Sequence, residues 1–432
     1  MQAPGSSGIP TPAAQPSATA RTRARAGAGW FTLFTVAWLA VWTVQLTPLQ
    51  LLLPLQLDTS DSAAGWISGV VSSGLVLGVG GLAGVLAGPI AGALSDRRGG
   101  SRPRRRPFAL AGVWLTSACL LLTGLSEGPL AVGASWVGVS VGAAIASAAF
   151  TAMIADQLPV AQRGAASSAA SSAQALGIVV GVGLVVLLGL SVFAGYALLA
   201  GIMAVLGTAT ALLLPDPSGR FFEAQAARPP GEPRFAFLHD RDFRWMLAGR
   251  LVVNIGNALG TSLFLFFLLY GIGRPAAKAE DDLLLLIVIY TVFVVAASVV
   301  VGTVSDRIGR RRGLTVAAAV VQAASAVVIV ASPTLAATMI AAALMGVGYG
   351  AFMAVGLAFA TDLLPSERDH ARDLGVVTVT AALGQLLGPV IGAALVALAG
   401  GFWLVYAMAG ALSLAGAALT ALARDRRAPI PS

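Results

Sequence analysis

Long apolar segments separated by short polar breaks occupy most of this chain. The segments have the length of about 20 residues that a helix needs to cross a bilayer core roughly 30 Å thick. The pattern predicts twelve such helices, at residues 30–55, 63–94, 108–126, 130–155, 166–190, 192–214, 244–271, 283–304, 313–331, 334–360, 374–398 and 402–423. The predicted fold class is therefore all-α integral membrane.

A short motif occurs twice, each time at the end of an apolar segment. The first copy spans residues 92–97 (GALSDR) and the second spans 302–307 (GTVSDR). A basic cluster follows each copy, at 104–106 and at 310–312. The repetition indicates that the chain is a duplicated membrane protein.

A second pair of landmarks supports the duplication. Asp156 and Asp362 each close a later apolar segment, and each has a proline three residues on and a glycine fourteen residues before. Asp96 lies 60 positions before Asp156, and Asp306 lies 56 positions before Asp362. The four extra residues precede the first basic cluster, so one insertion reconciles the halves. We therefore expect two pseudo-symmetric bundles of six helices.

The duplication and the charges together predict the domains and the topology. The expected parts are a disordered cytoplasmic N-terminus at 1–26, an N-terminal bundle at 27–214, a cytoplasmic linker at 215–243, a C-terminal bundle at 244–423 and a cytoplasmic tail at 424–432. Nearly every arginine falls in alternate loops. By the positive-inside rule, both termini of this multi-pass protein lie on the cytoplasmic side of the cell membrane.

Composition narrows the function classes. The chain is 57% hydrophobic and 11% charged, with a mean hydropathy of +0.85, which is more apolar surface than a soluble core can hide. Its net charge of +8 is spread over loops rather than gathered on one basic face, which argues against nucleic-acid binding. The single cysteine, Cys119, excludes an intrachain disulfide and a cysteine metal cluster. With no catalytic set, zinc-ligand spacing or nucleotide loop, we expect no enzyme activity and no cofactor.

Taken together, six plus six helices, a long central loop and the repeated motif resemble the major facilitator superfamily of transporters. The second motif copy, with Gly309 and the cluster at 310–312, matches the family loop well. The first copy is stretched and is similar to the version in sucrose/proton symporters and glycoside-transporting relatives, although Pro103 stands where those carry glycine. An arginine-rich chain with one lysine, Lys278, is also typical of a GC-rich bacterial gene. The resemblance implies a secondary transporter that works by alternating access.

The motif aspartates lie at helix C-termini, where the macrodipole disfavours a carboxylate. The resemblance implies that a helix N-terminus from the opposite half compensates each one, the helix at 374–398 for Asp96 and the helix at 166–190 for Asp306. The predicted conformational latch comprises Gly92, Asp96, Arg97, Gly302, Asp306 and Arg307, with Asp156 and Asp362 as further members facing Arg163, Arg368 and Arg372. The alternative is that these charges are solvated, fix topology and fasten neighbouring helices.

Candidate binding residues lie on one face of the helix at 244–271. Arg250, Asn254, Asn257 and Thr261 follow the spacing i, i+4, i+7 and i+11. Polar groups are costly in lipid and normally face a bundle interior or a water-filled cavity. The resemblance implies that this helix lines the transport cavity, which predicts contact with solute. Interhelical hydrogen bonding is the alternative.

The equivalent first helix presents Trp38, Trp42 and Gln45 on one face, and two rings with an amide suit a neutral solute. Trp38 is the weaker candidate, because tryptophan is also common at membrane interfaces. Tyr349 and Gln385 are further candidates.

The substrate and the coupling ion stay open at this point. No Asp, Glu or His falls in the middle of a predicted span, and Asp58 lies at the outer end of the first one. The partners expected are a small-molecule substrate, membrane lipid and a coupling ion, either proton or sodium, for a monomer. A neutral, sugar-like solute is slightly favoured; the alternatives are efflux of amphipathic compounds or a membrane receptor without transport.

Overall fold

The computed structural model describes residues 25–59, 65–97, 105–216, 240–363 and 370–424. The expected disorder at 1–26, most of the linker and most of the C-terminal tail lie outside these residues. The described elements are α1 (Ala28–Thr47), η1 (Pro48–Leu52), α2 (Leu53–Gln56), α3 (Gly65–Arg97), α4 (Arg106–Leu125), α5 (Gly128–Gln157), α6 (Val160–Leu187), α7 (Val192–Ile202), η2 (Met203–Gly207), α8 (Thr208–Leu213), α9 (Arg241–Ser262), α10 (Phe264–Phe266), η5 (Phe267–Gly271), α11 (Ala276–Ile308), α12 (Arg311–Ala331), α13 (Leu335–Asp362), α14 (His370–Ala399) and α15 (Trp403–Ala421).

The predicted all-α membrane fold is confirmed. In the described part of the chain, 11 helices are long and apolar enough to cross a membrane, or 12 if a bent pair counts as one span. That pair is Arg241–Ser262 with Phe264–Gly271, which meet at an angle of 43°. The η1 and η2 segments are single π-type turns inside the first and sixth spans, where they widen the helix without ending it.

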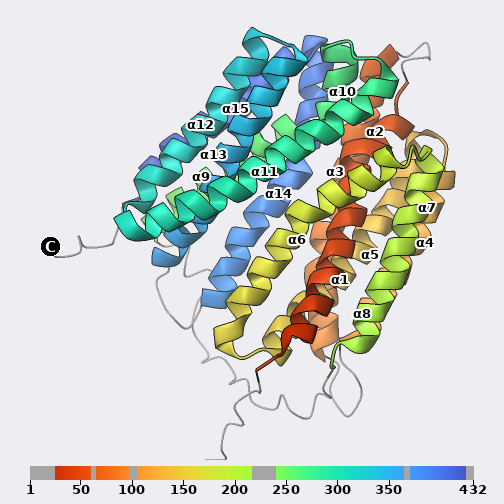
Figure 1. Ribbon diagram of the computed structural model, residues 1–432, viewed down its shortest axis with the longest axis vertical. Helices are drawn as coiled ribbons and strands as arrows, with labels where there is room; N and C mark the ends of the chain where they lie inside the picture. The colour runs from red at the N-terminus through yellow and green to blue at the C-terminus, as the bar shows by residue number, and fades with distance from the viewer. Residues whose placement is uncertain (1–24, 60–64, 98–104, 217–239, 364–369, 425–432) are drawn as a thin grey trace, which may run out of the picture.

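The helices form two groups that are continuous in sequence, α1–α8 and α9–α15 (Figure 1). Helix α3 of the first group packs against α14 of the second, and α6 packs against α11. Helix α1 begins and helix α15 ends on the same face of the molecule, which we call the terminal face. Helices α3, α5, α11 and α13 also end on the terminal face. The other end is the opposite face.

Small residues allow close packing inside each half. Gly384 of α14 faces the backbone of Asn254, and an added Cβ there would lie 2.8 Å from its carbonyl carbon. In the first half, Gly177 of α6 faces α1 in the same way, and its carbonyl accepts a hydrogen bond from Thr43. The glycines of these two helices are therefore explained by packing, as in many membrane bundles.

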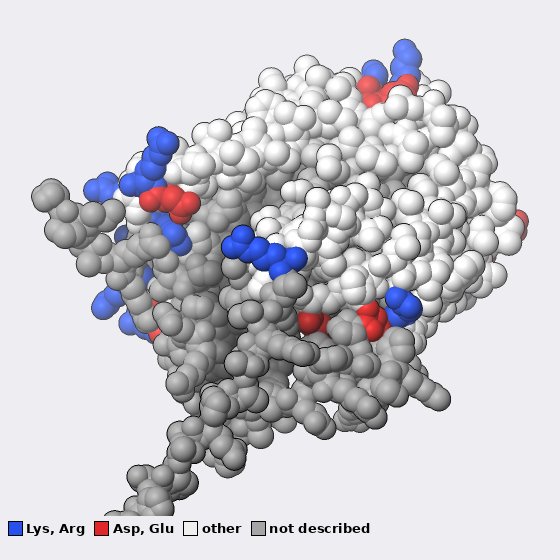
Figure 2. Space-filling model, turned by 60° about the horizontal axis from the view of Figure 1, so that its bottom comes forward, with Lys and Arg blue, Asp and Glu red and all other residues white. Residues whose placement is uncertain are grey.

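Charged side chains gather toward the two ends of the molecule, with a broad uncharged surface between them (Figure 2). Large apolar side chains project from that surface, among them Leu75, Leu82 and Ile90 of α3 and Val292 and Val299 of α11. Such a continuous apolar surface matches the hydrocarbon of a bilayer.

Two adjacent arginines stand at the start of α4 (Arg105 and Arg106) and two at the start of α12 (Arg311 and Arg312). The second arginine of each pair binds the end of another helix. Arg106 donates to the carbonyls of Ala211 and Leu212 at the end of α8, and Arg312 donates to the carbonyl of Ala423 after α15. These contacts satisfy carbonyls that a helix C-terminus leaves without partners.

The preceding arginine of each pair also holds two neighbouring helices. Arg105 donates to Asp156 at 2.7 Å and to the hydroxyl of Ser95, and Arg311 donates to the carbonyl of Ala358 at 2.5 Å. The sequence analysis expected Asp156 to face Arg163, and the structure adds Arg105 of the motif loop as a partner of Asp156. Arg163 donates to the carbonyl of Leu158 at 3.3 Å.

Candidate functional site

A cavity of about 270 Å³ lies between the two halves. Its walls come from α1, α3 and α5 of the first half and from α14 of the second, near the middle of α3 and α5. Three of the predicted binding residues line it, namely Trp42, Gln45 and Gln385. The fold therefore brings together an amide from each half and a ring from α1.

Trp136 and Ser140 of α5 complete the polar wall, and sequence reasoning did not propose either as a binding residue. Their spacing of four places both on one helical face, which is the signal that could have indicated them. Trp136 packs on Gly80 of α3, where an added Cβ would lie 2.4 Å from its ring, and Gly84 faces Ser140. These glycines bring α3 close to α5 and hold the Trp136 ring in the wall.

The chemistry of this cavity is uncharged. Of the described residues that line it, none is Asp, Glu, Lys, Arg or His. The indole Nε1 of Trp42 is buried and has no hydrogen-bond partner among the described residues. The remaining wall is aliphatic and includes Leu46, Leu77, Val85 and Leu386. Such a site binds an apolar surface and orients it with a few hydrogen bonds.

The polar face predicted on the helix at 244–271 lies elsewhere in this conformation. Tyr349 of α13 donates to the side-chain oxygen of Asn254 at 3.0 Å, and Tyr290 of α11 donates to that of Asn257 at 3.3 Å. Both asparagines are buried, and none of these residues lines the cavity. Their contacts fit the interhelical alternative.

Arg250 is also buried inside the second half. Its Nη2 donates to the sulfur of Met353 at 3.4 Å, while Nε and Nη1 have no hydrogen-bond partner. It does not line the cavity either.

The two halves meet firmly on the opposite face. The hydroxyl of Tyr270, in η5, donates to the carboxylate of Asp58, just after α2. Trp66 at the start of α3 stacks between Tyr270 and Phe402, with ring centroids 5.1 and 5.5 Å away. This aromatic cluster joins the first half to the second on that face.

Helix α3 packs closely on α14 between the opposite face and the cavity. Gly74, Gly78 and Gly81 of α3 lie on one helical face, and an added Cβ at each would come within 3.0 Å of a side chain of α14. Gly88 and Gly92 continue the same face toward the terminal face, where the α14 side chains at 370–378 lie outside the described residues.

The structure describes part of the predicted latch. The side chain of Asp306 is 70% exposed, and its only recorded ion pair is with Arg311 of its own loop, at 3.4 Å. Asp306 is thus not buried against α6 in this conformation. Gly302 and Arg307 lie beside it near the exposed end of α11, while the side chains of Asp96, Arg97 and Asp362 lie outside the described residues. The latch between halves stays a prediction.

The described acidic side chains lie toward the ends of the spans. In the described ranges, the acidic side chains lie near helix ends, such as Asp58 and Asp156, or near the start of α11, where Asp282 pairs with Arg274 at 2.5 Å. A search of those ranges finds no group of three His, Cys, Asp or Glu that could hold a metal ion.

Two bundles of membrane-spanning helices around a central cavity define the class of a multi-pass solute carrier. The family model described as Major Facilitator Superfamily matches this chain at residues 30–284 and 257–432. The chain belongs to this superfamily and is a membrane transporter of that type. A comparison with curated proteins gives no match.

Solved structures share the fold. A mutant of the nucleoside transporter NupG is 14% identical, with 90% of this chain and 98% of that chain covered and a TM-score of 0.71. A D-xylose-proton symporter is 14% identical (91% and 97% covered, TM-score 0.67). An inward-facing, occupied bacterial homologue of the human lysosomal transporter Spinster is 15% identical (91% and 93% covered, TM-score 0.65). At these identities the likeness concerns the fold alone.

Proposed function

We propose that this transporter carries a small, uncharged solute with several hydroxyl or amide groups, and that the solute binds in the cavity between the halves. The observation that carries the proposal is the wall itself. It combines the rings of Trp42 and Trp136 with the amides of Gln45 and Gln385, and no charged side chain of the described residues joins them. A sugar ring or a nucleoside has this mixture of an apolar face and hydroxyl groups.

The size of the cavity also favours a small solute. Its volume of about 270 Å³ lies just under the range of about 300–1,000 Å³ typical of ligand pockets. Among the solved structures with this fold are one of a nucleoside transporter and one of a D-xylose-proton symporter, which is compatible with such a solute. Coupling to a proton or to sodium, and a cytoplasmic position of the terminal face, are parts of the same proposal.

The aliphatic wall supports a second candidate, the export of amphipathic compounds. Leu46, Leu49, Leu77, Val139 and Leu386 give more apolar than polar lining. A flexible amphipathic molecule needs few hydrogen bonds, so it would depend on the rings and aliphatic side chains and little on the two glutamines.

Flux into proteoliposomes separates these candidates. The purified protein would be tested with radiolabelled D-xylose, uridine and the amphipathic cation tetraphenylphosphonium. We expect saturable flux of a neutral solute and its loss in Trp136→Ala. The matched control is Trp114→Ala on α4, because Trp114 is 56% exposed toward the lipid-facing surface and lies outside the cavity. Saturable flux of the cation alone would favour export, and an absence of flux for all three probes would contradict the proposal.

The motif latch belongs to the opposite conformation in this proposal. In the conformation described, the side chain of Asp306 is 70% exposed. Closing the terminal face would bring Asp96 to the start of α14 and Asp306 to the start of α6, where helix N-termini favour a carboxylate.

Charge-neutral variants test the latch. Asp96→Asn and Asp306→Asn should shift the population toward the conformation described, by roughly ten-fold if each contact contributes about 1.5–3 kcal/mol. Labelling of cysteines introduced on the two faces would measure the shift. Unchanged labelling in the double variant would leave these residues with a topological role only.

A further inference from the structure

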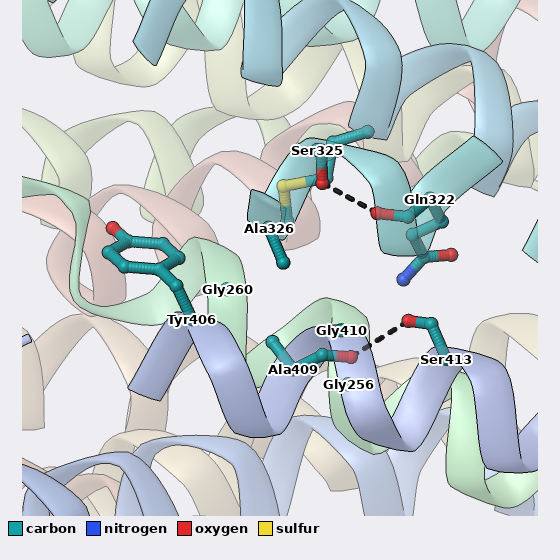
Figure 3. A pocket seen from close by; sticks show the side chains of 10 residues that line it. Gly256, Gly260, Gln322, Ser325, Ala326, Tyr406, Ala409, Gly410 and Ser413 are labelled. Atoms are coloured by element: carbon teal, nitrogen blue, oxygen red, sulfur yellow. Dashed lines mark hydrogen bonds between the residues drawn. The ribbon is translucent and has the colours of Figure 1, made fainter. Parts of the chain in front are cut away.

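A second, very small cavity lies inside the second half, away from the proposed solute site. It is enclosed by α9, α12, α13 and α15, and its volume is about 10 Å³ (Figure 3). That volume is about one water-sized sphere, so the cavity is too small for an organic ligand. Gln322 of α12 and Ser413 of α15 face each other across it (Figure 3).

Gln322 brings hydrogen-bonding groups that nothing in the protein satisfies. Its side chain is 3% exposed, and both its amide nitrogen and its amide oxygen lack a hydrogen-bond partner. A buried amide without partners costs on the order of 1–3 kcal/mol, so the fold should provide one. The amide offers two N–H donors and an acceptor oxygen to whatever occupies the cavity.

The two serines around the cavity can only accept. Ser413 donates its hydroxyl hydrogen to the carbonyl of Ala409 at 2.9 Å, and Ser325 donates its own to the carbonyl of Gln322 at 2.6 Å (Figure 3). Each oxygen keeps lone pairs free. An occupant that joins Gln322 to these serines must therefore accept a hydrogen from the amide nitrogen and donate hydrogens to the hydroxyl oxygens.

The equivalent place in the first half carries different side chains. From Arg105 to Arg311 and from Gly142 to Gly348 the distance along the chain is 206 residues, so Gln322 corresponds to Thr116. Thr116 bonds to the carbonyl of Gly112 at 2.8 Å, and a glycine of the next helix packs on it as Gly348 packs on Gln322.

The same shift relates a residue of the cavity wall to a larger side chain in the first half. It matches Ala326, which lines the cavity, to the fully buried Leu120. The smaller side chain of Ala326 leaves space, and the longer polar side chain of Gln322 beside it needs a hydrogen-bond partner.

The geometry points to a structural water site in this cavity, in which one water molecule accepts from the amide nitrogen of Gln322 and donates to the oxygens of Ser413 and Ser325. Water alone among common small occupants both accepts and donates. A monovalent cation cannot accept an N–H hydrogen, and a halide cannot donate one. Gly256 and Gly260 form the α9 side of the cavity, just before the 43° bend of that span, so the water joins α12 and α15 beside the bend.

A high-resolution cryo-EM or crystal structure of the full protein tests the site directly. We expect one density peak within about 3.2 Å of the Gln322 amide nitrogen, at hydrogen-bond distance. The peak should be lost in Gln322→Thr, which copies the residue that the fold accepts at the equivalent position. An empty cavity in the wild type, or an ion surrounded by oxygen atoms only, would overturn the inference.

A double-mutant cycle gives a second readout. Gln322 and Ser413 share no recorded direct hydrogen bond, so coupling between Gln322→Thr and Ser413→Ala has to pass through the water. Each single change should raise the equilibrium constant for unfolding by some factor. We expect the factor for the double variant to be at least about twofold smaller than the product of the two single factors.

The matched control for the cycle is Gln322→Thr with Thr420→Ala. Thr420 is a buried α15 hydroxyl bonded to the carbonyl of Gly416 at 2.8 Å, and it lies outside the cavity. In this control pair the two single effects on the unfolding equilibrium constant should multiply. If the effects of Gln322→Thr and Ser413→Ala also multiply, the proposed bridging water is contradicted.

Discussion

The two halves of this transporter share their framework but use their polar residues differently. In the first half, Trp42 and Gln45 of the first span face the central cavity. In the second half, the corresponding span directs Asn254 and Asn257 into hydrogen bonds with Tyr349 and Tyr290 of neighbouring helices. The difference teaches that duplication preserved the packing scheme, whereas the cavity proposed to bind solute is lined by the first half and α14.

Two loop ion pairs, which are not at equivalent positions of the two halves, differ in burial. Arg105 and Asp156 are 5% and 13% exposed, while Asp306, the partner of Arg311, is 70% exposed. A buried pair leaves an unpaired charge when one partner is removed, which costs far more than breaking a solvated pair.

The largest expected effect is therefore on stability in the first half. Asp156→Ala should lower the free energy of unfolding by about 3–5 kcal/mol, because it leaves Arg105 buried without its carboxylate. Asp306→Ala, which removes the 70% exposed partner of Arg311, should cost only about 0–1 kcal/mol. Thermal unfolding of both variants in the same detergent measures this, and equal losses would remove the asymmetry.

The next effect concerns the cavity wall. Gln45→Leu and Gln385→Leu should weaken solute binding by about 1–3 kcal/mol, because each removes a hydrogen bond from a water-poor site. Melting temperature without solute should change little, since neither amide has a recorded partner inside the protein. Titration calorimetry with the solute found in the flux screen measures the affinity. Wild-type affinity in both variants would move the binding site away from this wall.

Substitutions on the polar face of α9 should lower stability and leave solute affinity unchanged, which is the reverse of the result expected for the glutamines. The free-energy change should be of similar size. Asn254→Ala and Asn257→Ala each leave a buried tyrosine hydroxyl without its acceptor and should destabilise the protein by about 1–3 kcal/mol. Solute affinity should stay close to wild type. The opposite outcome, a loss of affinity with an unchanged melting temperature, would return α9 to the binding site and restore symmetry between the halves.

The smallest expected effect lies at the contact between the halves on the opposite face. Tyr270→Phe removes the hydrogen bond to Asp58 but keeps the ring that stacks on Trp66. One net hydrogen bond contributes about 0.5–1.5 kcal/mol, so the opposite face should open roughly two- to ten-fold more often. A cysteine replacing Leu77 in the cavity, in a Cys119→Ser background, would report this by its rate of labelling from that face.

The control for this measurement is Tyr196→Phe. Tyr196 is a fully buried tyrosine of the first half whose hydroxyl has no recorded partner, and it lies away from the contact. It should label at the wild-type rate. Equal labelling rates in the Tyr270 and Tyr196 variants would show that the hydroxyl of Tyr270 does not hold the two halves together.

The sequence by itself determined the twelve spans, the duplication and the membrane fold. Length and continuity of the apolar segments suffice for this, because a bilayer forces each crossing segment to satisfy its own backbone hydrogen bonds as a helix. The positions of Trp42, Gln45 and Gln385 on inward helical faces could also be predicted, since spacing gives the face of a helix.

Only the tertiary structure decided which neighbour each polar face meets. Asn254 and Asn257 have the spacing of a cavity face, but their partners Tyr349 and Tyr290 stand 95 and 33 residues further along the chain. In the same way Trp136 reaches the cavity because Gly80 lets α3 pack against α5. Helical periodicity is a local property, whereas a binding site is made by side chains that approach one another only after the helices have packed.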